Sequence, residues 1–188
     1  METGNIIFIT GGARSGKSSF AEDYAAAKAQ QKAVGLNYIA TSKPSDEEMV
    51  QRIKMHQRDR KKSENPWETW EWPFDLHEIV SHFKQSDVIL LDCLTVLLSN
   101  ELFREGKIND SRDNRQNVYQ SILEGIILLA SSVDTLIIVS NEVLTEPMSK
   151  APVVKSYAYL LGKLHQAIVQ DAKEAYLVEA GIPILMKE

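Results

Sequence analysis

An eight-residue stretch near the start of the chain constrains its fold more than any other feature. Residues 11–18 read GGARSGKS, which fits the pattern G-x-x-x-x-G-K-S of a phosphate-binding loop. An apolar run at 6–10 precedes the loop, and a run rich in helix-forming residues at 18–29 follows it. A strand, a glycine loop and a helix in this order are the structural context that the motif requires. The stretch therefore predicts a nucleotide-binding α/β fold.

Each part of this loop has a predicted role at a nucleoside triphosphate. The glycines let successive backbone N–H groups turn towards the phosphates, and the N-terminus of the following helix adds its partial positive charge. We expect Lys17 to lie at the loop surface and to reach the β- and γ-phosphates, and Ser18 to hold Mg²⁺. The predicted nucleotide contacts in the loop are Gly11, Gly12, Ala13, Arg14, Ser15, Gly16, Lys17 and Ser18.

Short apolar runs alternate with helical patterns along the rest of the chain. The predicted strands are residues 6–10, 37–40, 88–92, 136–140, 175–178 and 184–187. Further helices are predicted at 75–84, 112–130 and 153–172, and residues 61–73 are predicted to form an exposed loop. This alternation predicts a mostly parallel sheet flanked by helices, the three-layer sandwich of a RecA-like P-loop NTPase. Ligands of such a sheet bind at the carboxyl ends of its strands.

Composition indicates a single domain with an ordinary core. The chain has 188 residues, 44% of them hydrophobic and 25% charged, so we expect one nucleotide-binding domain over residues 1–188. The net charge of -5 argues against a protein that coats nucleic acid, and Cys93 is the only cysteine, which excludes a disulfide framework. The longest apolar stretch, residues 88–98, is too short to span a bilayer. We therefore expect a cytoplasmic protein with no nucleic-acid partner and no stable membrane insertion.

Two strand ends carry further candidate residues. The strand at 88–92 ends in Asp92, and in nucleotide-loop proteins an aspartate in this position orients Mg²⁺. The alternative role is that of an ordinary strand-end aspartate that caps a turn. Asn141 and Glu142 follow the strand at 136–140, at the same sheet edge as the loop. Glu142 is a candidate for positioning substrate or water, and a capping role is an equally open alternative.

A predicted helix at residues 45–60 carries the other candidate for chemistry. Ser45 begins it with a capping box, and Arg52, His56 and Arg60 recur at intervals of four, so they share one face. Two neighbouring guanidinium groups disfavour the protonated imidazole, which leaves His56 as a neutral nucleophile, and they can also hold phosphate. Taken alone, the helix favours the alternative of a histidine on a solvated basic surface.

Basic residues near this helix and three tryptophans admit a nucleic-acid interpretation. Trp67, Trp70 and Trp72 are of the type that stacks on bases. The acidic chain as a whole favours tryptophans that cover the core instead. His77, His82 and His165 lack partners at ligand-like spacing and are interpreted as structural. The sequence contains no N-K-x-D guanine signature, which disfavours a switch GTPase.

Taken together, these segments resemble the bifunctional adenosylcobinamide kinase and adenosylcobinamide-phosphate guanylyltransferase family of cobalamin biosynthesis. The resemblance keeps the family's order of segments and runs nearly end to end. The matching stretches are GGARSGKS at 11–18, YIATS at 38–42, DEEMVQRIKMHQRDR at 46–60, ILLDCLTVLLSNEL at 89–102, IIVSNEV at 137–143 and LVEAGIPILMK at 177–187.

This resemblance implies two reactions. In the first, ATP or GTP phosphorylates the hydroxyl of the aminopropanol arm of adenosylcobinamide. In the second, GTP guanylylates a histidine that aligns with His56, and the GMP passes to the phosphorylated corrinoid. The resemblance also implies a homo-oligomer of the family type, such as a trimer. Lys17 and His56 are the implied catalytic residues. The further implied nucleotide contacts are Ala40, Thr41, Ser42, Gln57, Arg58, Asp59, Arg60, Glu71 and Asp92.

The sequence departs from the family pattern outside the phosphate loop and His56. Met55 stands where a second histidine commonly precedes the nucleophile, and residues 144–148 read LTEPM where the family usually has G-x-G-I-V-P. Residues 155–166 also differ, in the region expected to meet the corrinoid or a neighbouring subunit. The alternative function is a different small-molecule kinase of the same fold, without guanylyltransferase activity and with a structural His56.

Overall fold

A computed structural model describes residues 5–32, 34–43, 66–104, 111–142 and 151–188 of the chain. Its strands form one sheet in the order β3-β2-β4-β5-β1-β6-β7. Every neighbouring pair is parallel except β6 and β7, which are antiparallel. The strands are β1 (Asn5–Gly11), β2 (Leu36–Ala40), β3 (Trp67–Glu71), β4 (Val88–Asp92), β5 (Thr135–Asn141), β6 (Glu174–Glu179) and β7 (Ile182–Lys187).

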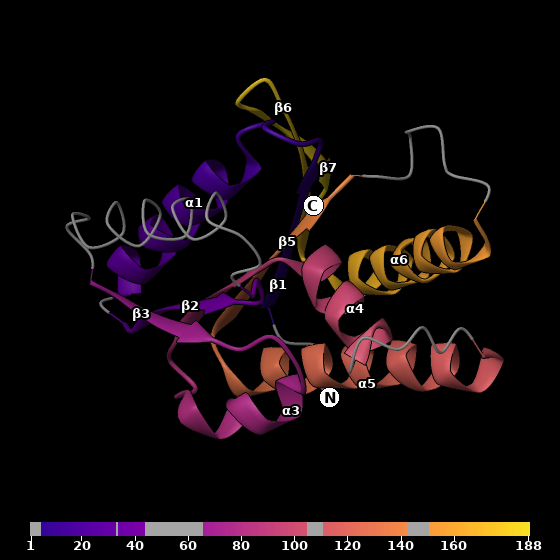
Figure 1. Cartoon of the computed structure of the whole chain (residues 1–188). Coiled ribbons are helices and arrows are strands. Elements are labelled where there is room, and N and C mark those ends of the chain that lie inside the picture. The colour runs from indigo at the N-terminus through magenta and orange to yellow at the C-terminus, as the bar shows by residue number, and fades with distance from the viewer. Residues whose placement is uncertain (1–4, 33, 44–65, 105–110, 143–150) are drawn as a thin grey trace.

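Helices cover both faces of this sheet (Figure 1). One face packs against α1 (Lys17–Lys32), and the other packs against the remaining helices. These are α3 (Leu76–Ile79) with the short 3-10 helix η1 (Val80–His82), α4 (Leu94–Leu102), α5 (Arg112–Ser132) and α6 (Pro152–Asp171). The result is the predicted three-layer sandwich with a mostly parallel sheet.

The central strands are apolar on both faces because both faces are covered. Along β1, Ile6 and Phe8 join the core under α5 and α6, whereas Ile7 and Ile9 join the core under α1. A strand buried on both sides therefore reads as a continuous apolar run and not as an alternation. On the α1 side, alanines at four-residue spacing let the helix approach the sheet closely: Ala21, Ala25 and Ala29.

The predicted strands are confirmed with shifts of at most two residues at their ends, but one predicted loop is wrong. Residues 61–73, predicted as an exposed loop, contain strand β3 at the edge of the sheet. The Trp70 indole donates a hydrogen bond to Asn37 Oδ1 at 3.1 Å. Aromatic and β-branched residues favour strands, and the flanking Pro66 and Pro73 stand outside β3, so they do not interrupt its pairing with β2. Trp67, Trp70 and Trp72 pack on the core, as predicted.

Two helices also differ from the predictions. Helix α4 is absent from the sequence prediction, because its apolar residues follow β4 closely, with only Asp92 and Cys93 between the last leucine of the strand and the first leucine of the helix. Its buried residues Leu94, Leu97 and Leu98 have helical spacing, which is the signal that distinguishes it from the strand. The helix predicted at 75–84 is shorter, since α3 passes into the 3-10 turn η1. The predicted helix at 45–60 lies outside the described residues. None of the described helices is long and apolar enough to cross a membrane.

Candidate functional site

The candidate site residues meet at the carboxyl edge of the sheet. Strand pairing places Gly11 opposite Asn141, and Ala40 opposite both Glu71 and Asp92. Because β1 to β5 run parallel, all these strand ends face the same edge, where ligands of open α/β sheets bind. The placement of these residues therefore agrees with the sequence prediction. His56, Gln57, Arg58, Asp59 and Arg60 lie outside the described residues.

The phosphate-binding loop joins the end of β1 to α1 and depends on its glycines. Gly16 has a φ of 90°, a conformation that side chains rarely adopt. A Cβ atom on Gly11 would lie 2.5 Å from the Val178 carbonyl oxygen and 2.6 Å from Ser15 Oγ, so only glycine fits. The Ser15 hydroxyl is buried and has no hydrogen-bond partner among the described residues. A buried hydroxyl of this kind gains a partner when a polar ligand occupies the loop.

Lys17 is the first residue of α1, and its side chain folds back over the loop. It is 8% exposed, and its Nζ donates a hydrogen bond to the Gly12 carbonyl oxygen at 3.0 Å. The prediction that Lys17 lies at the loop surface is therefore wrong. The compact loop covers the aliphatic stem of Lys17. Its ammonium group points inward because the loop offers it a backbone carbonyl oxygen as an acceptor. The positive charge is thus held within the loop.

Tyr38, on the neighbouring strand, orients Asp92 at the end of β4. The Tyr38 hydroxyl donates a hydrogen bond to Asp92 Oδ2 at 2.8 Å, and a bond to a carboxylate is stronger than one between neutral groups. Tyr38 is not among the residues predicted from the sequence. The pairing register of β2 and β4 explains this contact. Tyr38 pairs with Leu90, and Asp92 follows Leu90 by two residues, so the side chains of Tyr38 and Asp92 lie on the same face of the sheet. Asp92 and Ser18 offer carboxylate and hydroxyl oxygens, the ligand type that Mg²⁺ prefers.

Thr41 joins the ends of β2 and β4. Its side chain is fully buried, and its hydroxyl accepts a bond from the Cys93 amide at 2.8 Å and donates one to the Cys93 carbonyl at 2.9 Å. The Thr41 hydroxyl is therefore already engaged in hydrogen bonds within the protein. Among the predicted contacts at 40–42, the half-buried Ala40 and Ser42 remain open to a nucleotide.

The turn between β6 and β7 supports the phosphate loop from outside, a contact that the sequence does not predict. The Gly181 amide donates a hydrogen bond to the Ser15 carbonyl at 2.8 Å. The two chain segments lie so close that a Cβ atom on Gly16 would be 3.1 Å from Gly181 Cα. Gly181 has a φ of 80°, which the turn requires. The glycine between two apolar runs at 177–187 signals the hairpin, but not its contact with the loop.

We expect Gly181→Ala to weaken nucleotide binding by about three- to tenfold. The added methyl group strains a left-handed backbone by roughly 1–2 kcal/mol, and the turn then shifts away from Ser15. Ala180→Gly is the matched control, because Ala180 has a φ of 49° and glycine relieves its strain. Titration calorimetry with GTP measures both variants. Equal dissociation constants for Gly181→Ala and the unchanged protein would show that the turn does not support the loop.

A polar cluster lies beside the end of β5 and ties two helices to it. Asn141 donates a hydrogen bond to the Thr95 hydroxyl at 2.9 Å, and the Tyr157 hydroxyl donates one to the Thr95 carbonyl at 2.9 Å. Cys93 Sγ lies 3.0 Å from the Thr95 hydroxyl. Burial, and next the charge of Asp92, raises the pKa of the Cys93 thiol, so it stays protonated and is a poor nucleophile. The cluster therefore positions α4 and α6 at the sheet edge.

Glu142 and His165 flank the same strand end. The Glu142 amide donates a hydrogen bond to the Gly11 carbonyl at 2.9 Å, which joins the start of the loop to the end of β5. His165 Nε2 lies 2.7 Å from Ser140 Oγ, and its ring packs edge-on against Phe8. Burial lowers the pKa of His165, while the charge of Glu142 opposes this shift. These contacts agree with a structural role for His165.

A family model described as cobinamide kinase / cobinamide phosphate guanyltransferase matches residues 7–186. The chain is 30% identical over 188 residues to the bifunctional adenosylcobalamin biosynthesis protein CobU of Escherichia coli (strain K12), covering 97% of this chain and 99% of that protein. It is 32% identical over 180 residues to the bifunctional adenosylcobalamin biosynthesis protein CobP of Pseudomonas aeruginosa, covering 95% of each.

Solved structures show a similar fold at low sequence identity. The flagellar accessory protein FlaH from Methanocaldococcus jannaschii has a TM-score of 0.52 and 15% identity, over 100% of this chain and 80% of that one. A solved ATPase domain has a TM-score of 0.50 and 16% identity, over 94% of this chain and 70% of that one. These likenesses concern the fold alone, and they agree with the predicted three-layer α/β sandwich.

Proposed function

This chain belongs to the cobinamide kinase / cobinamide phosphate guanyltransferase family and is a transferase, and we propose that one domain over residues 1–188 carries out both reactions by a two-step route. ATP or GTP first phosphorylates the aminopropanol hydroxyl of adenosylcobinamide. GMP is then transferred from GTP, through a guanylylated His56, to give adenosyl-GDP-cobinamide. The observation that carries the proposal is the family match from residue 7 to residue 186, which includes both the phosphate loop and the histidine segment.

In the kinase step, the loop holds the triphosphate through its backbone N–H groups and the N-terminus of α1. The substrate hydroxyl oxygen bonds to the γ-phosphorus and releases its proton to solvent. The bond between the γ-phosphorus and the bridging oxygen breaks, and the nucleoside diphosphate leaves. Lys17 offsets the negative charge on the transferring group. Ser18 and Asp92 would hold Mg²⁺, and the bound cation would supply positive charge beside the phosphates. Glu142, anchored at Gly11, positions the hydroxyl.

In the transfer step, a neutral imidazole nitrogen of His56 attacks the α-phosphorus of GTP and pyrophosphate leaves. A phosphate oxygen of the phosphorylated corrinoid then attacks the same phosphorus, and the bond to His56 breaks. Arg52 and Arg60 disfavour protonation of the imidazole and offset charge on the phosphorus oxygens. The further nucleotide contacts that we propose are Ala40, Thr41, Ser42, Gln57, Arg58, Asp59, Glu71 and Asp92.

We further propose that the protein acts as a homo-oligomer of the family type, such as a trimer. Edge strand β7 supports this, because four of its apolar side chains are between 42% and 65% exposed. Exposed apolar side chains on an edge strand are ones that a second copy can cover. These side chains are Ile182, Ile184, Leu185 and Met186.

Mass spectrometry of the intact protein after incubation with GTP and Mg²⁺ tests the two-step route. We expect a covalent GMP adduct that is labile in acid and stable in base, as a phosphoramidate is. Kinase turnover without any adduct would support the plain kinase instead, an alternative that the departures at Met55 and 144–148 favour. Nucleotide binding without either reaction would contradict both functions.

We expect Asp92→Asn to reduce turnover and raise the Mg²⁺ concentration needed for half-maximal rate, while metal-free nucleotide binding changes little. Asparagine keeps an oxygen that accepts the Tyr38 bond but removes the charge that attracts the cation. Tyr38→Phe is the matched control, because it removes that hydrogen bond and leaves the carboxylate in place. An unchanged Mg²⁺ dependence in Asp92→Asn would make Asp92 a strand-end residue with no metal role.

A further inference from the structure

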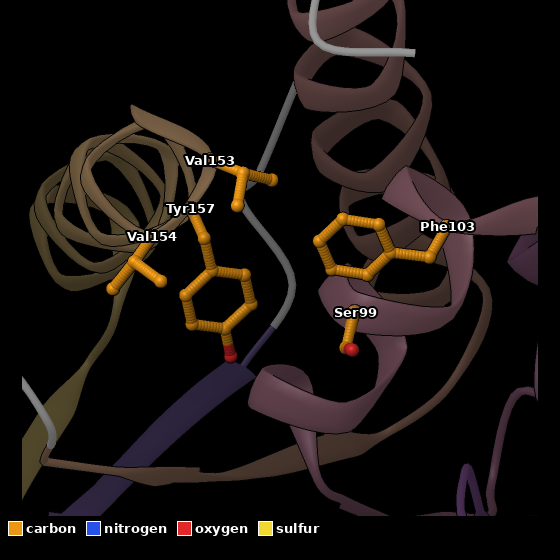
Figure 2. A pocket seen from close by; sticks show the side chains of 5 residues that line it. All are labelled: Ser99, Phe103, Val153, Val154 and Tyr157. Atoms are coloured by element: carbon orange, nitrogen blue, oxygen red, sulfur yellow. The ribbon is translucent and has the colours of Figure 1, made fainter. Parts of the chain in front are cut away.

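An apolar pocket opens between α4 and α6 (Figure 2). Its volume is about 220 Å³. Figure 2 shows the ring of Tyr157, from α6, and the ring of Phe103, from the residue that follows α4, facing the pocket, with Ser99 of α4 beside Phe103. None of the described lining side chains is charged, and Val154 at the rim is 36% exposed. The described lining residues are Ser99, Phe103, Val153, Val154 and Tyr157.

Hydrogen bonds connect this pocket to the end of the strand beside the phosphate loop. The Tyr157 hydroxyl donates to the Thr95 carbonyl, and the Thr95 hydroxyl accepts from Asn141, both at 2.9 Å. Asn141 in turn pairs in register with Gly11, the first residue of the loop. Because the Tyr157 hydroxyl is engaged on the protein side, its ring is the part that the pocket presents to a ligand. The pocket is thus a neighbour of the nucleotide edge and not a remote cavity.

The position of the pocket along α4 determines the kind of ligand that can bind in it. The helix begins at Leu94, next to Asp92 and Cys93, and rises 1.5 Å per residue, so Ser99 and Phe103 lie roughly 8 and 14 Å further along the axis. A ligand held there reaches the phosphates only if its reactive group sits on an arm. An uncharged, apolar and aromatic lining suits the body of such a ligand and does not suit a phosphate.

We propose that this pocket is a subsite for the apolar rim of the acceptor's macrocycle, which leaves the hydroxyl-bearing arm free to extend along α4 to the phosphate loop. The inference rests on the proposed function, since it takes the acceptor to be a corrinoid. Pockets that enclose a whole drug-sized ligand measure about 300–1,000 Å³, so this smaller one holds only an edge of the ring system. The adenosyl ligand and the rest of the macrocycle stay outside it.

Equilibrium dialysis with cobinamide, which carries the macrocycle and the arm, tests the subsite on the whole protein. We expect Val154→Glu to raise the dissociation constant for cobinamide at least about fivefold, because a carboxylate resists transfer into an apolar site. Its dissociation constant for GTP should stay unchanged, and the KM for adenosylcobinamide should rise more than kcat falls. Ile127→Glu is the matched control, since Ile127 is 47% exposed on α5 and does not line the pocket.

A second substitution, Val154→Phe, occupies the pocket without introducing a charge and covers the case in which Val154→Glu fails to fold. We expect it too to weaken cobinamide binding. Unchanged cobinamide affinity in folded Val154→Glu or Val154→Phe would overturn the subsite, as would an equal loss in Ile127→Glu. If the unchanged protein binds no cobinamide at all, the corrinoid acceptor itself is wrong, which is a failure of the proposed function and is distinct from a misplaced subsite.

Discussion

Lys17→Ala is expected to reduce phosphoryl transfer by roughly 10²- to 10³-fold or more, the scale seen when one preorganised charge-stabilising group is removed from an active site. The Lys17 ammonium is already held within the loop by its bond to the Gly12 carbonyl. Its charge is therefore in place before substrate binds and needs little reorganisation as negative charge develops. A coupled assay of nucleoside diphosphate release measures the loss in kcat.

The fold of this variant should survive, although Lys17 is more buried than the sequence predicted. At 8% exposure, the truncation removes a covered stem and the hydrogen bond to the Gly12 carbonyl, whose loss costs about 1 kcal/mol of stability. Lys28→Ala on the same helix is the matched control, because its ammonium lies 5.2 Å from the centre of the Tyr24 ring and away from the loop. Near-normal turnover in Lys17→Ala, with Lys28→Ala unchanged, would refute the assignment of the loop.

Most of the sheet could be predicted because its strands are buried on both faces. Because residues such as Ile7 and Leu90 are buried, apolar and polar residues do not alternate along these strands, and each strand reads as an apolar run. The apolar runs of β1 and β5 end side by side at the sheet edge where the loop motif begins. The same pattern hides α4, whose apolar residues resume directly after Asp92 and Cys93 at the end of β4. Strand β3 was missed because Pro66 and Pro73 read as breakers, whereas they stand outside the paired residues.

The contacts that complete the site depend on tertiary packing and could not be predicted from local sequence. The inward bond of Lys17 depends on the loop's final shape, and the support from Gly181 joins turns from opposite ends of the chain. Sequence spacing identifies residues on one helix or at one strand end, but it does not show which distant turn packs on them. The hydrogen bond from Tyr38 to Asp92 lies between these two cases, because it can be predicted once the pairing register of β2 and β4 is known.

His56→Ala is expected to abolish the GMP adduct and guanylyl transfer while kinase activity persists. The reason is chemical: without an imidazole nitrogen no bond to the α-phosphorus of GTP can form, whereas Lys17, Ser18 and Asp92 remain available for the first step. Intact-protein mass spectrometry with GTP measures the adduct, and phosphorylation of adenosylcobinamide measures the kinase step on the same sample. His77→Ala, at an exposed position of α3, is the matched control and should retain both activities.

Arg60→Ala tests the contribution of a neighbouring guanidinium group to the reaction of the proposed nucleophile. We expect it to slow adduct formation without eliminating it, because one guanidinium, that of Arg52, still disfavours imidazole protonation and offsets charge on the phosphorus oxygens. Peptide mapping that finds GMP on His77, His82, His165 or a lysine would refute His56 as the nucleophile. Kinase loss in His56→Ala equal to the loss of transfer would instead show that the two steps share this residue.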